Sequence, residues 1–230
     1  MISVLFALAL APVAVACVYM YIRDKYEKEP IWLLLTGLAF GAFITVPIIY
    51  TAVFTTFLLP ANMGVFGDAA FSAFVSAAFV EEIYKFGVLF FLIWYNRNLN
   101  EPLDGIVYAV FISLGFAGVE NALYVFSPEL GGVETALLRA VFSVPGHALF
   151  GVMMGYYFAL AKFEPRNKGR YLLAAFFFAW ALHGAYNFIL LSQMQWWLIV
   201  FIPFTLYMWR GGLKKIRIHL ENSPFKAELH

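Results

Sequence analysis

Residues 79–91 read FVEEIYKFGVLFF, and this stretch decides the fold because it sets two glutamates and a lysine inside an apolar run. Phe, Val and Leu flank Glu81, Glu82 and Lys85 on both sides. Each charge at the centre of a lipid bilayer costs roughly 2.5–3.5 kcal/mol on insertion scales. We therefore expect a helix whose polar face points into a helical bundle and whose apolar face contacts lipid.

The rest of the chain has the composition of an integral membrane protein. Of its 230 residues, 63% are hydrophobic and only 13% are charged, whereas about 25% are charged in a typical soluble domain. So few charged groups could not cover the surface of a soluble fold. The formal net charge of +1 gives no indication of nucleic-acid binding. The single cysteine, Cys17, excludes an intramolecular disulfide and a cysteine-based zinc site.

Apolar runs long enough to cross a membrane follow one another along the chain, since about 20 helical residues span the hydrocarbon. They lie at 2–22, 31–59, 69–95, 105–126, 135–162 and 171–191, with a shorter one at 195–210. We therefore expect an all-α, polytopic bundle of about seven transmembrane helices. Residues 1–210 would form a single transmembrane helical domain and residues 211–230 a short basic cytoplasmic tail. Pro47 and Pro145 are candidate kink sites.

Lysine and arginine residues gather on alternate loops of this expected topology. They occur within 23–28, at 97, within 162–170 and within 210–226, whereas 60–68, 127–134 and 192–194 contain none. Because positive residues are retained on the cytoplasmic side, this alternation predicts an external N-terminus and a cytoplasmic C-terminus.

Ionisable residues inside the predicted spans fall at similar depths. Counted from the outer end of each span at about 1.5 Å per residue, four of them lie roughly 9–18 Å deep. These four are Glu81, Glu120, His147 and His183. We expect them to converge on one polar layer beneath the outer surface of the membrane.

Helical spacing adds further residues to the same faces. Lys85 lies four residues after Glu81 and three after Glu82, so all three share one sector of a helix. His183 and Asn187 share a face in the same way. On the fifth span, a stripe recurs every four residues: Arg139, Ser143, His147, Gly151 and Gly155. The two glycines in the stripe predict close approach of a neighbouring helix.

Several of these residues could stabilise the helical bundle without taking part in a reaction. Lys85 is expected to neutralise one glutamate, and Arg139 to pair with an acid or a lipid phosphate. Asn187 fits a hydrogen bond between helices as well as a functional role. Because one lysine offsets only one of two adjacent acids, the Glu81–Glu82 pair suits general acid–base catalysis.

Glutamate and histidine at one depth can activate water directly or hold a divalent metal such as zinc. The candidate metal ligands are Glu82, Glu120, His147 and His183, with the metal requirement left open. The chain has no HExxH, GxSxG or CxxC motif and no glycine-rich phosphate loop. Water activation by glutamate is therefore the favoured chemistry, and amide hydrolysis the favoured reaction.

Four motifs, in the expected order, resemble those of the PrsW-type intramembrane proteases. They are EExxK at 81–85, DGIVYAVFISLGFAGVEN at 104–121, RAVFSVPGHALFGVMMG at 139–155 and HGAYNF at 183–188. The segment RDKYEKEP at 23–30 and the short basic tail are also similar. The resemblance covers nearly the whole chain and extends to a wider superfamily that includes the prenyl-protein CAAX proteases.

This resemblance implies that Glu81, Glu82 and His183 are tied to activity. By similarity to the superfamily, the first glutamate would activate water. His183 and Asn187 would stabilise the tetrahedral oxyanion, which makes all four residues candidate catalytic residues.

The superfamily's Phe-x-x-x-His motif corresponds here to Phe116-x-x-x-Glu120, and His147 is the natural substitute for the missing histidine. Glu120 and His147 are thus expected to position water or substrate. Family members of known role make the first cut in a membrane-anchored anti-sigma factor, on its extracytoplasmic side, in stress signalling. The resemblance implies a multi-pass protease of the bacterial cytoplasmic membrane. Its partners would be a membrane-anchored protein substrate and lipid, not nucleic acid.

Two other function classes also require acids and histidines inside a membrane. A proton- or ion-coupled transporter is one, although the sequence shows no inverted repeat and no paired broken spans. A non-catalytic scaffold is the other, in which the polar layer only sets the register of the helices. Uptake into liposomes would favour the transporter, and unchanged cellular function after Glu81→Gln would favour the scaffold.

Overall fold

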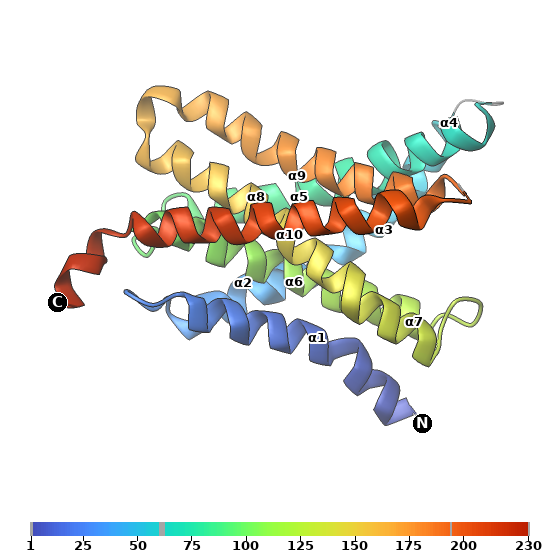
Figure 1. The fold of residues 1–230 in the computed structure, drawn as a ribbon, viewed down its shortest axis with the longest axis horizontal. Helices are drawn as coiled ribbons and strands as arrows, with labels where there is room; N and C mark the ends of the chain where they lie inside the picture. Colours follow the sequence, from blue (N-terminus) through green and yellow to red (C-terminus); the bar gives the residue numbers. More distant parts are fainter. Residues whose placement is uncertain (1, 60–62, 194, 230) are drawn as a thin grey trace.

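The computed structural model describes residues 2–59, 63–193 and 195–229, and this part of the chain is helical without strands. The long helices lie side by side as an elongated bundle (Figure 1). In chain order the elements are α1 (Ile2–Arg23), α2 (Ile31–Phe43), α3 (Thr45–Thr56), α4 (Gly64–Phe71), η1 (Ser72–Phe79), α5 (Val80–Ile93), α6 (Pro102–Val125), α7 (Val133–Leu138), η2 (Arg139–Ser143), α8 (Val144–Phe163), η3 (Pro165–Asn167), α9 (Lys168–Leu191), α10 (Trp197–Glu221) and η4 (Pro224–Leu229). Of the short elements, η1 and η2 are π-helical, and η3 and η4 are 3₁₀ turns.

Five helical segments of the described chain are long and apolar enough to cross a membrane. They are Ile2–Arg23, Ile31–Thr56, Pro102–Val125, Val133–Phe163 and Pro165–Leu191. Two further predicted spans are helical but are not among these five segments. One runs through α4, η1 and α5 and carries the Glu81–Glu82 pair, and the other is α10, whose second half is basic. The all-helical membrane fold is therefore confirmed, whereas the count of seven spans stays a prediction.

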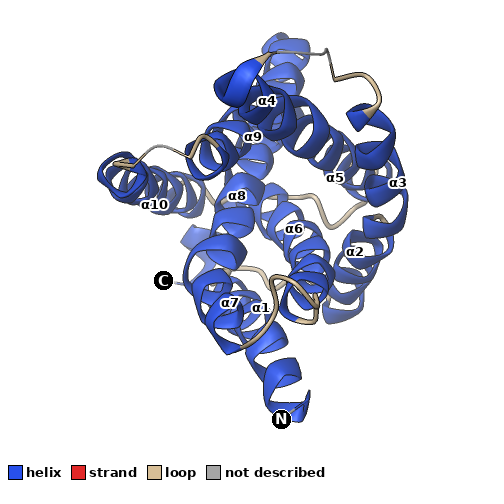
Figure 2. Ribbon diagram, turned by 90° about the vertical axis from the view of Figure 1, so that its right-hand side faces the viewer, coloured by secondary structure: helices blue, strands red, loops and turns tan. Residues whose placement is uncertain are grey.

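The core of the bundle is built around α6. Its residues 103–118 are buried at every position, and end-on α6 lies inside a ring of other helices (Figure 2). No charged residue occurs between Asp104 and Glu120, so α6 can be enclosed by α1, α2, α5 and α8 without burying an unpaired charge along this stretch. The two ends of α6 carry the acids on which both polar clusters of the protein depend.

Both predicted kink sites coincide with irregular helix. The helix predicted over residues 31–59 is interrupted at Ile44, between α2 and α3, three residues before Pro47. Proline lacks an amide hydrogen, and its ring crowds the carbonyl four residues earlier, which is Phe43. Pro145 follows the π-helical turn η2 in the same way. These two prolines therefore explain why the helices bend where they do.

Glycines let α6 and α8 approach at backbone contact, as the spacing in the fifth span predicted. A Cβ atom added to Gly155 would lie 2.3 Å from the carbonyl oxygen of Gly105 and 2.5 Å from Cα of Ile106. At Gly151 the same atom would lie 3.0 Å from the carbonyl oxygen of Ala109. Since backbone atoms of a packed helix cannot move aside locally, α6 and α8 would have to separate.

Gly155→Ala is accordingly expected to destabilise the protein by about 1–3 kcal/mol, the usual cost of overpacking. Thermal unfolding in detergent, followed by circular dichroism, measures this loss. Gly87→Ala on α5 is the matched control, because no atom lies within 4 Å of an added Cβ there. Equal melting temperatures for the two variants would contradict the close contact.

The loops separate by charge along the bundle. The N-terminus, α4, α7 and the α9–α10 turn lie at one end of the molecule, and the C-terminus lies at the other (Figure 1). The C-terminal end also receives the basic loops after α1, α5 and α8, which agrees with the predicted alternation. The helix α10 continues through residue 210, and its Gly212, Ile216 and His219 are buried. The proposed tail thus begins as a packed helix, with His219 stacked on Tyr156 at 4.3 Å between ring centroids.

Candidate active site

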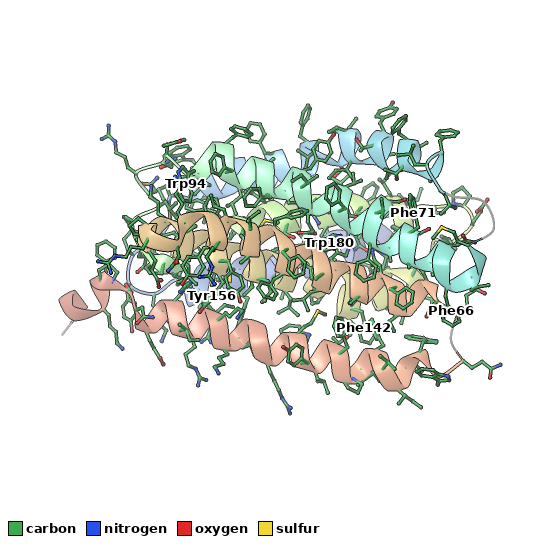
Figure 3. All side chains as sticks on the ribbon, turned by 90° about the horizontal axis from the view of Figure 1, so that it is seen from above. Phe66, Phe71, Trp94, Phe142, Tyr156 and Trp180 are labelled. Carbon is green, nitrogen blue, oxygen red and sulfur yellow. The ribbon has the colours of Figure 1, made fainter. Side chains whose placement is uncertain are left out.

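Two π-helical turns lead directly into the predicted site residues. The turn η1 ends at Phe79, just before Glu81, and η2 ends at Ser143, one helical turn before His147. A π-turn widens the helix and frees a backbone group, which is one reason such turns occur at functional sites. Here the carbonyl oxygen of Phe74 in η1 accepts a hydrogen bond from the Trp180 indole at 2.8 Å. Trp180 lies on α9, near the middle of the bundle (Figure 3).

Gly184 allows η1 to lie against α9 at the height of the site. A Cβ atom at this position would fall 2.2 Å from the ring of Phe74. Because Gly184 follows His183 directly, the contact brings the start of α5 next to the imidazole. The HGAYNF sequence therefore supplies both a polar side chain and the space that lets its partners approach.

The glutamate pair and the lysine form one buried group at the start of α5. The Lys85 ammonium donates to Glu82 Oε1 at 2.8 Å and to Glu81 Oε2 at 3.2 Å. Glu82 is fully buried, and Lys85 is 1% and Glu81 6% exposed. Lys85 thus pairs with both acids and not only with one, and it also lies 4.2 Å from the ring centroid of Phe116.

His183 joins this group from α9. Its Nδ1 lies 2.9 Å from Glu82 Oε1, and its Nε2 lies 3.8 Å from Glu81 Oε2. The Asn187 amide nitrogen lies 3.2 Å from Nε2. A neutral ring that donates from Nδ1 to Glu82 and accepts at Nε2 from Asn187 satisfies these contacts. Stacking on Phe150, with ring centroids 4.5 Å apart, fixes the plane of the imidazole.

His147 connects the glutamate pair to a second set of charges. Its Nδ1 lies 3.4 Å from the Lys85 ammonium, and its Nε2 lies 3.0 Å from Glu120 Oε2. The Arg139 guanidinium donates to the same Glu120 oxygen at 2.5 Å and, through Nε, to Asn121 at 2.9 Å. Arg139 therefore pairs with an acid, which was one of the two partners predicted from the sequence; the other was a lipid phosphate.

A cavity of about 480 Å³ opens beside this polar layer. Its polar lining comprises Glu81, Glu120, Arg139, Ser143, His147, His183 and Asn187. Aromatic and aliphatic residues make up most of the remaining wall: Phe142, Phe150, Tyr186, Leu190, Trp197 and Phe201. Phe142 lies on the side of η2 that faces α10 (Figure 3), where its ring is 5.5 Å from that of Phe201. A cavity with few polar groups in an apolar wall is the usual form of a binding site.

The two adjacent glutamates differ in their access to the cavity. Glu81 lines it, whereas Glu82 and Lys85 lie behind Glu81 and do not. The lining also reaches Leu138 of α7 and Leu191 and Leu198 beside the α9–α10 turn. Those elements lie at the end of the bundle that holds the N-terminus (Figure 1), so the cavity extends toward the end whose loops lack lysine and arginine.

Four of these residues meet the requirements of a metal site by donor type and spacing. Glu81, Glu82, His147 and His183 each offer a ligand atom, and these atoms all lie within 4.8 Å of one another. Glu82 Oε2 is buried and has no hydrogen-bond partner among the described residues, so it is available as a ligand. Carboxylate and imidazole are ordinary zinc ligands. The residues present therefore fit a divalent metal.

This group differs from the predicted ligand set in one member. Glu81 takes the place of Glu120, which is held instead by Arg139 and His147. The Lys85 ammonium contacts three of the four ligand residues, so a metal ion would have to compete with it for these atoms.

The structure brings all of the predicted site residues into one connected layer. It also adds residues that sequence reasoning missed. Asn121 bridges Arg139 and the carbonyl oxygen of Ala9, at 2.9 and 2.7 Å, and Phe150 stacks on His183. Phe150 lies three residues after His147, so helical spacing could have found it. Asn121 follows Glu120 directly in the sequence, so helical spacing did not place the two side chains on one face.

Comparison with known proteins agrees with the motifs. Residues 29–209 match the family described as PrsW family intramembrane metalloprotease. A protein named Protease PrsW from Geobacillus kaustophilus is 38% identical over 213 residues, which cover 93% of this chain and 91% of that protein. The Oceanobacillus iheyensis protein of the same name is 38% identical over 97% of this chain and 99% of its own length.

The protein named Protease PrsW from Bacillus subtilis is 34% identical over 90% of this chain and 92% of its own length. No solved structure matches the chain significantly. The matched region contains every residue of the polar layer. The structure has a buried glutamate–histidine layer beside a cavity, and the relatives align along almost their whole length. This chain therefore belongs to the PrsW family of intramembrane metalloproteases and is a membrane-embedded peptidase.

Proposed function

We propose that this protein is a glutamate-dependent endopeptidase that cuts a single-span membrane protein near the extracytoplasmic side of the membrane. Glu81 acts as the base toward water, and His183 and Asn187 stabilise the charge that develops on the substrate. The observation that carries this proposal is the cavity in which the carboxylate of Glu81, the imidazole of His183 and the amide of Asn187 converge. Membership of a peptidase family favours this function over the transporter and scaffold alternatives.

The reaction can be assigned to side chains of this layer. Glu81 takes a proton from a water molecule in the cavity as the water oxygen attacks the carbonyl carbon of the scissile amide. The negative charge that forms on the carbonyl oxygen is stabilised by the Asn187 amide, which His183 orients through its hydrogen bond at Nε2. Glu81 then returns its proton to the amide nitrogen, the C–N bond breaks, and a carboxylic acid and an amine leave.

The charges around Glu81 suit this role. With both imidazoles neutral, the layer holds three carboxylates and two cations, which leaves one net negative charge. Lys85 lies closer to Glu82 than to Glu81, and Arg139 is paired with Glu120. Glu81, the acid with the longer contact to Lys85, is the one that faces the cavity. The excess charge is thus placed where a base is needed.

We further propose that the protein uses a divalent metal such as zinc, held by Glu82, His147 and His183, which leaves Glu81 to act as the base toward water. Such an ion supplies Lewis-acid polarisation of the scissile carbonyl or of the attacking water. Glu120 and Arg139 would then orient His147 from its other nitrogen, a common arrangement for metal-binding histidines. These roles follow from donor type and from the 4.8 Å grouping.

The membrane placement is proposed from charge and cavity position together. Seven spans, an external N-terminus and a cytoplasmic C-terminus put the basic loops inside the bacterial cell and the cavity in the outer half of the cytoplasmic membrane. The proposed substrate is a membrane-anchored anti-sigma factor, cut first at its extracytoplasmic side. The support for this substrate class is the resemblance described above.

The purified protein in lipid nanodiscs should therefore cleave a single-span anti-sigma factor, and mass spectrometry should place the new termini on the extracytoplasmic side of the span. A chelator should abolish cleavage and zinc should restore it. Cleavage that persists at full rate in chelator would assign the chemistry to Glu81 and water alone. A cut on the cytoplasmic side would contradict the proposed orientation.

A further inference from the structure

A second buried cluster of acids lies at the opposite end of the bundle from the cavity. It joins the α1–α2 loop to the start of α6, at the end where the C-terminus lies (Figure 1). Its members are Asp24, Glu27, Glu29, Glu101 and Asp104. Asp24, Glu101 and Asp104 are fully buried, and Glu29 is 1% exposed. Burying several carboxylates together is costly unless a cation or protons compensate them.

Hydrogen bonds account for only one oxygen of each fully buried acid. Asp104 Oδ2 accepts from the backbone amides of Asn100 and Glu101, at 2.8 and 2.7 Å. Asp24 Oδ2 accepts from the amide of Glu29 at 3.1 Å. Glu29 Oε2 accepts from the hydroxyl of Tyr108, and Glu101 Oε2 from that of Ser223.

The remaining oxygens are buried and have no hydrogen-bond partner in the part of the chain that the structure describes. They are Asp24 Oδ1, Glu27 Oε2, Glu29 Oε1, Glu101 Oε1 and Asp104 Oδ1. Five unpartnered oxygens at one place are an exception to the rule that buried polar atoms are satisfied, and an unseen ion is one of its standard explanations.

Neighbouring basic side chains compensate the cluster only in part, because the charge of Lys28 lowers the pKa of Asp24 by less than burial raises it. Among the described residues, none of these five acids forms an ion pair with lysine or arginine. The Lys28 ammonium is close, but it donates to the backbone carbonyl oxygens of Tyr21 and Asp24. Burial raises the pKa of Glu29 to about 11, and repulsion from Asp104 adds to the rise. Without a cation, these acids can therefore be buried together only if some of them keep their protons.

Three of the acids have the spacing of a cation site. One oxygen from each of Glu27, Glu29 and Asp104 lies within 4.8 Å of the other two. Ligand oxygens lie about 2.0–2.6 Å from Mg²⁺ or Ca²⁺, so two of them on opposite sides of an ion are roughly 4–5 Å apart. An all-oxygen, carboxylate-rich donor set selects such hard cations over zinc or copper.

We infer that Glu27, Glu29 and Asp104 bind a hard divalent cation of the Mg²⁺ or Ca²⁺ type, which ties the α1–α2 loop to the start of α6. This site differs from the metal group beside the cavity in its lack of histidine and in its position at the other end of the bundle. The competing explanation is a proton shared between Glu29 and Asp104, which would need no cation.

Isothermal titration of the chelator-stripped, full-length protein in detergent with MgCl₂ and with CaCl₂ tests the inference. We expect one ion to bind per chain and to raise the melting temperature. Glu29→Gln and Asp104→Asn should each weaken binding by roughly tenfold or more, because each removes one charged ligand. Glu129→Gln is the matched control, since Glu129 is exposed on the loop after α6 at the opposite end.

Two outcomes would contradict the cation site. If neither ion binds, or if binding is unchanged in Glu29→Gln and Asp104→Asn, the cluster is not a cation site. A higher melting temperature of ion-free Glu29→Gln than of the ion-free parent, with no response to either ion, would support the shared proton. If those two variants fail to fold, Glu27→Gln gives the same answer, because its side chain is only partly buried.

Discussion

Glu81→Gln is expected to lower the cleavage rate of a single-span substrate by roughly 10²–10⁴-fold, the usual contribution of a general base. The amide of glutamine has the size of the carboxylate but cannot accept a proton from water. Glu81 faces the cavity, and its Oε2 is 3.2 Å from Lys85, so the substitution leaves the cavity walls in place. Cleavage in nanodiscs, followed by gel electrophoresis and mass spectrometry of the products, measures the effect.

Two comparisons make this prediction specific. Glu221→Gln, exposed at the end of α10, should cleave at the parental rate. Glu82→Gln should lose activity as well, and it should also lower the melting temperature, because Glu82 holds both Lys85 and His183 at hydrogen-bond distance. Full activity of a folded Glu81→Gln protein would remove Glu81 from the reaction.

Lys85→Met is expected to destabilise the protein by about 3–5 kcal/mol, the cost of removing one partner from a buried ion pair. The substitution keeps most of the volume but leaves Glu81 and Glu82 buried without their cation. Unfolding in mixed micelles, monitored by circular dichroism, gives the free energy. Lys214→Met on the exposed face of α10 is the control, with little expected change.

A double variant tests the cause of that loss. Lys85→Met combined with Glu82→Gln removes one of the two carboxylate charges left without a cation, so part of the stability should return. If the double variant is as unstable as the sum of the single variants, then Lys85 contributes through packing against Phe116 and not through charge.

Much of the fold was predictable because the membrane penalises charge. A chain with 13% charged residues must place most of its surface in lipid, and the few ionisable groups inside its helices must find one another. Glu81, His147 and His183 were predicted at one depth on that basis alone, and they lie in one connected layer. Pro47 and Pro145 similarly indicated the positions of irregular helix.

Other features depended on contacts between distant segments. Neighbouring residues on an α-helix point about 100° apart, so the sequence could not say which of Glu81 and Glu82 faces the cavity. The rotation of α5 is set by η1, whose Phe74 packs on Gly184 of α9. Likewise, Arg139 could pair with an acid or a lipid phosphate, and only the packing of η2 against α6 directs it to Glu120.

The buried acids at the end of the bundle opposite the cavity also depend on contacts between distant segments. Glu29 and Asp104 lie in a loop and at a helix start, outside the apolar runs of the sequence. They become buried because the α1–α2 loop folds over the start of α6, near Tyr108 and Ser223. The sequence by itself determined the membrane class, the family and the membership of the polar layer, since each follows from motif or from the free-energy cost of a charge in lipid. Which oxygen faces which partner was decided only by tertiary structure, because that choice depends on helix rotation and on contacts between residues far apart in the chain.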